Sequence, residues 1–200
     1  MEPEEMLSSS EQYWKLRDCA KRSAKGDRFL EIRSRWFTLF GEHLEDSQGQ
    51  QLEYWRIEKA DSVIILPIHD RRILLPPPSY RPGVSEMTLD FPGGRVPEGQ
   101  TPQEAIPKIL QRELGIEVSD IAQLTPLNSQ GWAVNSSFSN QKLFGFVANL
   151  REDLNVPPEF VTNTYPTTSE GVQDLLKELI CLQCRVVLLE WWNSAVRSLQ

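Results

Sequence analysis

Cysteine and histidine are scarce in this chain of 200 residues, which contains three cysteines and two histidines. Both histidines, His43 and His69, lie far from the cysteines in sequence. Cys181 and Cys184 have the C-x-x-C spacing of redox dithiols and of half a zinc site. The chain has no second pair of this kind, and apolar residues surround this one. The pattern therefore favours packing of both thiols in a helix or strand over a redox or zinc role.

The sequence also lacks an excess of positive charge and long apolar runs. It has 21 Lys and Arg against 28 Asp and Glu, a net charge of −7. This charge disfavours general nucleic-acid binding, because phosphate backbones attract basic surfaces. A small anionic ligand stays compatible, since a local basic pocket can act against the overall sign. No apolar run approaches the ~20 residues that span a membrane, and the acidic start lacks the pattern of a targeting peptide. We expect a cytoplasmic location.

What the chain does have is the composition of a globular protein, with 40% hydrophobic and 24% charged residues. This length fits one domain with a short extension. The polar residues at the start predict that residues 1–27 form a partly disordered extension, with a short helix over 11–25. We expect residues 28–200 to form the domain.

Apolar periodicity predicts the elements of this domain. A β-hairpin is predicted within residues 28–60, and further strands at 62–68, 73–75, 121–127 and 142–150. A helix follows a Gly-rich loop, and we place its start near Gln103 or Glu104 because Pro107 is costly in a helix interior. A single last helix is predicted from Ser169, as N-cap, to Ser194. This order predicts an α/β/α sandwich with a mixed sheet, an N-terminal β-hairpin and a C-terminal helix.

The Gly-rich loop is the most informative segment. Residues 90–100 read DFPGGRVPEGQ, and a helical segment ending in Glu113-Leu114-Gly115-Ile116 follows. Gly93 and Gly94 allow the backbone to turn tightly and to approach a ligand. Together the segments resemble the Nudix box, the loop-helix-loop motif that binds magnesium and a diphosphate in Nudix hydrolases.

The resemblance extends over about residues 28–195. Glu53-Tyr54-Trp55, Asp61-Ser62-Val63 and Tyr80-Arg81-Pro82 resemble the ADP-ribose pyrophosphatase branch of the Nudix hydrolases, as does the Gly-rich loop. This resemblance implies a Nudix fold and magnesium-dependent cleavage of a nucleoside diphosphate linked to a second group. It also implies a homodimer formed through the N-terminal hairpin.

The acidic positions of the box are mostly replaced. The Nudix pattern has R-E and E-E at the positions of Lys108, Ile109, Arg112 and Glu113, which we expect on one helix face. The formal charge there changes from −2 to +1, and Arg112 cannot lose its proton. Magnesium prefers oxygen ligands, so this change predicts impaired hydrolysis.

Two glutamines continue this loss of charge. Gln100 occupies the position of the first Glu of the box, and Gln141 ends a loop in which the resemblance expects Glu. Glu113 and Glu98 remain as candidate catalytic residues and Glu113 as the metal ligand, with Mg²⁺ as the cofactor if the protein is active and otherwise none. An ion pair with Arg112 or Lys108 is the alternative for Glu113, and a solvated surface charge the alternative for Glu98 and Glu104.

The change of sign suggests a different role for the helix. Lys108 and Arg112 are candidates to contact a diphosphate directly, in place of magnesium; a plain surface position is the alternative for Arg112. The other candidate ligand-binding residues are Gly93, Gly94, Arg81 and Tyr80. Trp36 and Trp55 fit hairpin packing or a dimer interface better than ligand stacking.

Three functions are compatible with these residues. We favour a catalytically impaired module that binds a nucleotide diphosphate or a protein partner. The second is a weak magnesium-dependent Nudix hydrolase, and the third is a structural subunit with a vestigial pocket.

Overall fold

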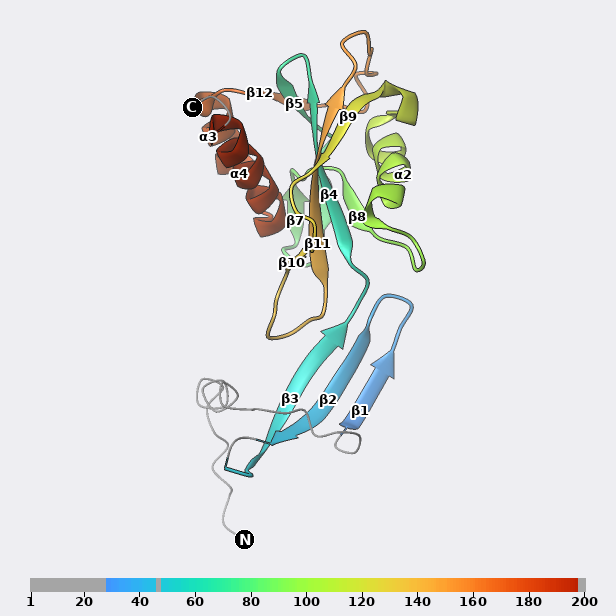
Figure 1. The fold of residues 1–200 in the computed structure, drawn as a ribbon, viewed down its shortest axis with the longest axis vertical. Coiled ribbons are helices and arrows are strands. Elements are labelled where there is room, and N and C mark those ends of the chain that lie inside the picture. Colours follow the sequence, from blue (N-terminus) through green and yellow to red (C-terminus); the bar gives the residue numbers. More distant parts are fainter. Residues whose placement is uncertain (1–27, 46–47, 198–200) are drawn as a thin grey trace. The chain divides into compact units, whose positions relative to one another are not determined.

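A computed structural model describes residues 28–45 and 48–197 (Figure 1). The predicted extension over 1–27, with its helix, lies outside the described residues. The chain divides into two compact units. One unit contains the described residues up to Lys59 together with Asn135–Asn140, and the other contains Ala60–Val134 and the residues from Gln141 onward.

The N-terminal unit is built on an antiparallel sheet of three strands. These are β1 (Arg28–Arg33), β2 (Thr38–Glu45) and β3 (Gln51–Glu58). The β2–β3 pair confirms the predicted hairpin, to which β1 adds a third strand. Arg56 is buried on this sheet, where its guanidinium donates to both carboxylate oxygens of Glu42 at 2.8 and 2.9 Å and lies 4.4 Å from the ring centre of Phe40.

The second unit contains a mixed sheet of seven strands. Its central strand β4 (Ser62–His69) pairs in parallel with β11 (Lys142–Leu150) and antiparallel with two other strands. The remaining strands of this sheet are β5 (Arg72–Leu75), β8 (Gly93–Arg95), β9 (Ile121–Pro126), β10 (Trp132–Ala133) and β12 (Asn163–Pro166). Two short strands, β6 (Ser79–Arg81) and β7 (Glu86–Thr88), form a separate ribbon.

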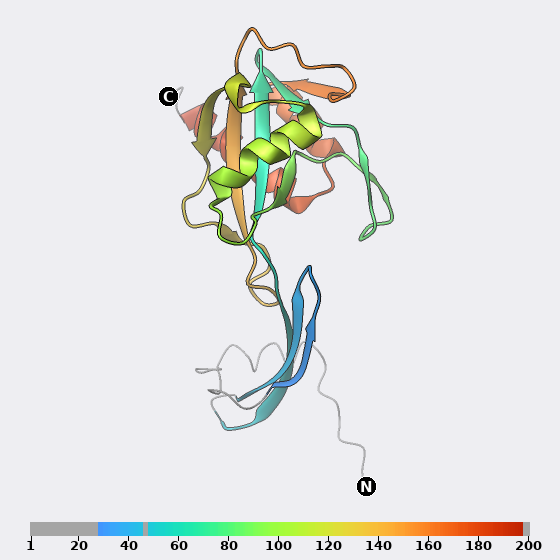
Figure 2. The ribbon, with the colours of Figure 1, turned by 90° about the vertical axis from the view of Figure 1, so that its right-hand side faces the viewer.

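Helices cover both faces of this mixed sheet (Figures 1 and 2). Helix α2 (Pro102–Leu114) lies on one face, while α3 (Ser169–Glu178) and α4 (Leu182–Arg197) lie on the other. Successive residues of β4 alternate between two cores, as the period of a strand requires. Val63 and Ile65 join the α2 side, and Ile64 and Leu66 join the α3–α4 side. This arrangement confirms the predicted α/β/α sandwich.

Helix α2 begins earlier than predicted. Thr101 is the N-cap, and the helix contains Pro107 in its interior. The Thr101 hydroxyl accepts from the backbone N–H of Glu104, and the Glu104 carboxylate accepts from the backbone N–H of Thr101 at 2.6 Å. This capping box stabilises the first turn. The helix starts at Pro102, one residue before Gln103, the earlier of the two expected starts, and the pattern T-x-x-E is visible in the sequence.

The single C-terminal helix predicted from Ser169 to Ser194 is two helices. Thr168, and not Ser169, is the N-cap of α3, and the chain is extended at Leu179. Arg185 in α4 reaches back and donates to the carbonyl oxygens of Leu176 and, at 3.0 Å, Leu179. These bonds satisfy acceptors that the end of α3 leaves open, which explains why the break is stable. No described helix is long and apolar enough to cross a membrane.

A glycine at the start of α3 allows a close approach of two backbone segments. A Cβ atom on Gly171 would lie 2.1 Å from the Pro166 carbonyl oxygen. We expect Gly171→Ala to lower the free energy of unfolding by about 1–3 kcal/mol, as overpacking does, measured by urea denaturation. Gly83→Ala is the control, because no atom lies within 4 Å of its Cβ position, and its effect should stay within about 0.5 kcal/mol. Equal stability of the two variants would contradict this packing.

Candidate functional site

The prediction that Gly93 and Gly94 form a tightly turning loop was wrong, because both lie in strand β8, pair with β4 and have no positive φ. Two neighbouring charged residues of α2 hold this segment. Glu113 accepts a hydrogen bond from the backbone N–H of Gly93 at 3.1 Å, and Arg112 donates to the Gly93 carbonyl oxygen at 3.1 Å. The two side chains also form an ion pair with each other. Both carboxylate oxygens of Glu113 are therefore engaged within the protein. The ion pair with Arg112, which was the alternative role for Glu113, is present.

The apolar side chain of Ile109 lies against Gly94. Ile109 is only 3% exposed and belongs to the core on the α2 side of the sheet. A Cβ atom on Gly94 would lie 3.3 Å from Ile109 Cδ1. The Nudix pattern has a glutamate at position 109, so an apolar side chain fills the space where that carboxylate would stand. Lys108 is exposed on the same helix and has no hydrogen bond or ion pair with any residue that the structure describes.

The other carboxylates near the box either cap the helix or are exposed to solvent. Glu98 is exposed in the segment between β8 and α2. Glu104 serves the capping box, where the N–H and the hydroxyl of Thr101 lower the pKa of its carboxyl group. Gln100 is exposed, and Gln141 is buried at 6% exposure.

These donors do not fit an ordinary Nudix magnesium site. Within residues 28–45 and 48–197, one group of three His, Cys, Asp or Glu side chains has ligand atoms close enough for a shared ion, and it does not contain Glu98, Glu104 or Glu113. Magnesium requires near-octahedral oxygen ligands, while the helix presents one engaged carboxylate, a buried isoleucine and an arginine. No catalytic step through magnesium follows from this geometry.

A pocket of about 270 Å³ lies beside the loop. Its lining residues are Pro76, Pro77, Ser79, Arg81, Asp90, Phe91 and Glu113. Two predicted site residues, Arg81 and Glu113, thus meet in one pocket. Tyr80 is not in the lining and is 58% exposed, because successive residues of a strand point to opposite faces.

Asp90 organises this pocket, although it was not among the residues predicted for the site. One carboxylate oxygen, Oδ2, accepts from Arg81 Nε at 2.7 Å and from the Thr88 hydroxyl at 2.8 Å. The hydrogen bond to Asp90 raises the pKa of the Arg81 guanidinium, which therefore stays charged. Asp90 is itself only 9% exposed. The available signal was its position at the start of the Asp90-Phe91-Pro92-Gly93-Gly94 segment.

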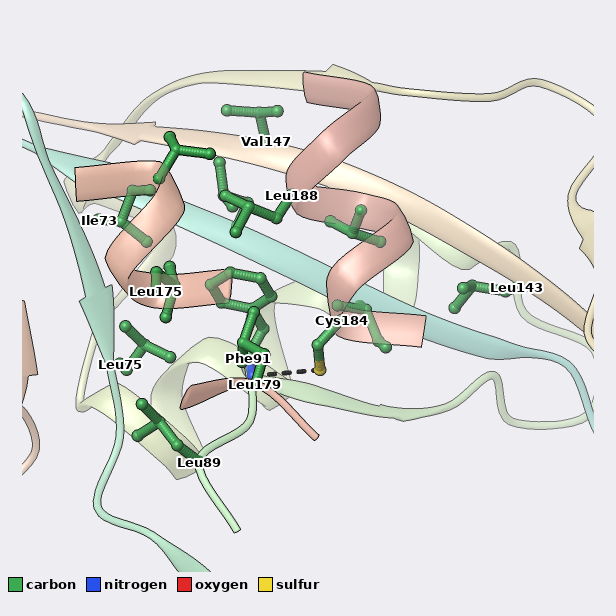
Figure 3. Packing of buried hydrophobic residues seen from close by; sticks show 14 residues of the cluster. Ile73, Leu75, Leu89, Phe91, Leu143, Val147, Leu175, Leu179, Cys184 and Leu188 are labelled. Atoms are coloured by element: carbon green, nitrogen blue, oxygen red, sulfur yellow. Dashed lines mark hydrogen bonds between the residues drawn. The ribbon is translucent and has the colours of Figure 1, made fainter. Parts of the chain in front are cut away.

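The two cysteines of the C-x-x-C pair lie on the other side of Asp90. Cys184 is 1% exposed and packs in the core of the α3–α4 side, which confirms the predicted packing (Figure 3). Its sulfur accepts from the Phe91 backbone N–H at 3.4 Å and lies 3.6 Å from Asp90 Oδ1. Hydrogen bonds from the Cys184 thiol and from backbone N–H groups at the start of α4 lower the pKa of Cys181 to about 6.

Comparison with known proteins supports the fold. No protein-family model matches the sequence, and no curated protein matches it either. Among the solved structures that match is the crystal structure of an ADP compounds hydrolase, with a TM-score of 0.67 and 25% sequence identity. The match covers 90% of this chain and 98% of that one. Together with the mixed sheet and its helices, this likeness confirms the predicted Nudix-type fold.

The apolar character of position 109 gives a stability prediction. We expect Ile109→Glu to lower the free energy of unfolding by at least about 2 kcal/mol, because lost packing alone costs roughly 2–5 kcal/mol and a buried carboxylate adds to it. Lys108→Glu places the same residue on the exposed side of the helix and should change stability by less than about 0.5 kcal/mol. Urea denaturation measures both. An Ile109→Glu variant of native stability, further stabilised by Mg²⁺, would show instead that this position faces a cation site.

Proposed function

We propose that this chain is a Nudix-type module that binds a nucleotide diphosphate of the ADP-ribose kind and that its hydrolytic site is impaired. The observation that carries this proposal is the arrangement of Arg112, Glu113 and Ile109 around the loop glycines. Arg112 lies at the glycines and forms an ion pair with Glu113. The apolar Ile109 occupies the position where the Nudix pattern has another glutamate. We expect the module to act in the cytoplasm.

The positive groups of the site suit a diphosphate. Arg81 lines the pocket and its bond to Asp90 uses Nε, so among the residues that the structure describes both terminal nitrogens are left for phosphate oxygens. An arginine fork matches phosphate geometry. Arg112 is exposed at 61% of its side chain, so a phosphate can compete with Glu113 for it. Arg81 and Arg112 then offset the ligand charge that magnesium offsets in active Nudix enzymes.

Only one of the remaining predicted contacts joins the proposed ligand site. Gly93 and Gly94 were also predicted contacts, but the missing side chains make room for protein atoms, the Val63 carbonyl oxygen and Ile109, so neither glycine is part of the proposed contact set. Tyr80 was also a predicted contact, but it lies outside the pocket lining and points away from Arg81, so it is not part of the proposed contact set. Lys108, exposed on α2, is proposed as a further phosphate contact. The likeness to an ADP compounds hydrolase supports ligands that contain ADP.

A weak magnesium-dependent hydrolase is the second candidate. It is favoured by the position of Glu113 in the pocket lining and by the exposed Glu98. One or two carboxylates together with substrate phosphates can bind magnesium. In that case Mg²⁺ is the cofactor, and Glu113 has to leave Arg112 and Gly93 to reach it.

Ligand binding without a divalent ion tests the first candidate. We expect ADP-ribose to bind the full chain equally well with Mg²⁺ and with excess EDTA in isothermal titration calorimetry. Arg112→Gln should weaken binding at least about tenfold, because a hydrogen bond to a charged group contributes roughly 1.5–3 kcal/mol and about 1.4 kcal/mol is a factor of ten. Arg151→Gln, at an exposed pair with Asp153, is the control and should bind normally.

Two results would contradict this proposal. Tight binding that disappears on chelation would show that a metal ion, and not arginine, holds the diphosphate. Robust product release from nucleoside diphosphate substrates with Mg²⁺ or Mn²⁺, lost in Glu113→Gln, would establish the hydrolase instead. Absence of any nucleotide ligand in a thermal-shift screen would favour the structural subunit.

The N-terminal unit carries a group of exposed apolar side chains. Among these are Phe29 (44% exposed), Ile32 (51%), Trp36 (55%), Phe37 (42%) and Trp55 (39%). Clustered exposed apolar residues mark interaction surfaces. We therefore propose that two chains form a homodimer through this sheet, as the resemblance implies.

This dimer predicts a change of mass in solution. The double variant Ile32→Ser, Trp36→Ser should shift sedimentation from dimer to monomer, because each substitution removes apolar area from the interface. Val118→Ser alters an exposed apolar residue of the other unit (61% exposed) and should leave the dimer intact. A native chain that sediments as a monomer would contradict the proposal.

A further inference from the structure

Three metal-binding side chains meet beside the pocket. Asp90, Cys181 and Cys184 each offer one ligand atom, and these atoms lie within 4.8 Å of one another. They come from two distant parts of the sequence: Asp90 precedes β8, while the cysteines lie at the start of α4. The sequence shows only the pair of cysteines. A zinc role was disfavoured on that basis, because no further ligands were apparent. The tertiary structure supplies a third ligand.

The distances suit a tetrahedral ion. With Zn–S bonds of about 2.3 Å and Zn–O bonds of about 2.0–2.2 Å, a tetrahedron has an S–O edge of about 3.5 Å and an S–S edge of about 3.8 Å. The distance from Cys184 Sγ to Asp90 Oδ1 is 3.6 Å. The other pairs, now within 4.8 Å, have to close by at most about 1.3 Å to reach these edges. The Cys181 side chain is only partly buried, so it has room to move towards such a geometry.

The surrounding hydrogen bonds orient the same atoms. Arg81 and Thr88 both bond to Oδ2 of Asp90, so Oδ1 is turned towards the sulfur of Cys184. The Phe91 backbone N–H donates to that sulfur (Figure 3), and such a donor stabilises a metal-bound thiolate. Partners that hold ligands in place in this way are typical of metal sites.

Charge and ligand type indicate the class of ion. Two thiolates and one carboxylate carry a formal charge of −3, which a divalent ion and the Arg81 guanidinium together neutralise. Thiolates select borderline-soft ions such as Zn²⁺ over magnesium. Binding releases the thiol protons to solvent, because the thiolate is the ligand form.

We propose that Asp90, Cys181 and Cys184 bind one Zn²⁺ ion, with water in the fourth position. The ion links the start of α4 to the segment before the loop glycines. This proposal does not require nucleotide binding, because the ion takes Oδ1 of Asp90 and the thiols while the proposed nucleotide site takes the terminal nitrogens of Arg81; the two sites are coupled through the Arg81–Asp90 pair. The competing explanation is a simple thiol–carboxylate hydrogen bond.

Cobalt titration of the reduced full-length chain under anaerobic conditions tests the proposal. We expect one equivalent of Co²⁺ to give thiolate-to-cobalt charge-transfer absorption and the intense visible bands of a tetrahedral site. Zn²⁺ should abolish both signals. Native mass spectrometry should show one Zn²⁺ per chain. Absence of the charge-transfer band, or a spectrum of six oxygen ligands, would overturn the site.

Variants assign the ligands. Cys181 is partly exposed, so Cys181→Ser should fold. This variant should lose about half of the charge-transfer intensity and bind Co²⁺ at least about tenfold more weakly. Asp90→Asn should weaken binding by a similar factor and keep both sulfur ligands. Thr88→Val should weaken binding roughly 10–100-fold through the carboxylate that it orients. Cys19→Ser, which removes the third cysteine of the chain, is the control and should bind normally. Loss of binding in Cys19→Ser, or full binding in both Cys181→Ser and Asp90→Asn, would refute the assignment.

Discussion

The central strand β4 is buried on both faces, and this burial arranges the sheet and the two helix layers around the site. Its apolar residues alternate between two cores, so one helix layer has to cover each side of the sheet. Helix α2 covers one side and α4 covers the other. The segment from Asp90 to Gly94 runs between these layers. It therefore meets Glu113 from α2 and Cys184 from α4 within a few residues.

The face of α2 beneath β8 presents an apolar side chain and an ion pair to the glycine segment. The close approach of Gly94 is retained, but it is made to the hydrocarbon of Ile109. Arg112 and Glu113 close on each other across the backbone of Gly93. The loop is thus held by fixed protein charges. A ligand that carries its own negative charge fits such a site better than a cation does.

Asp90 connects the two sides of this region through its two oxygens. Oδ2 fixes Arg81 at the pocket, and Oδ1 faces the cysteine pair. A buried carboxylate is unfavourable unless it is paired, and here Arg81, Thr88 and Cys184 provide the partners. A metal ion on Oδ1 would make the orientation of Arg81 part of the same network. The pocket and the thiols are therefore coupled by one side chain, even though they serve different proposed ligands.

Local features of this protein could be predicted from the amino-acid sequence alone. The apolar runs at 62–68 and 142–150 predicted the central strands because a strand buried on both faces needs an apolar side chain at almost every position. The loop glycines and the replaced residues at 109 and 112 are equally visible in one segment. The capping-box pattern from Thr101 to Glu104 is also visible in this segment. The expected helix start was placed after Thr101 because Pro107 is unfavourable in a helix interior.

Features that depend on distant partners became visible only in the folded chain. The break after α3 is held by a shorter-range contact, from Arg185 to a carbonyl six residues earlier, but apolar periodicity does not report a bond from a side chain to the backbone. The pocket joins Arg81 to Glu113, and the proposed ion site joins Asp90 to cysteines some ninety residues away. Periodicity reports which face of an element is buried, but it carries no information on which other segment lies against that face. Contacts between such segments arise only when the sheet and its two helix layers pack together.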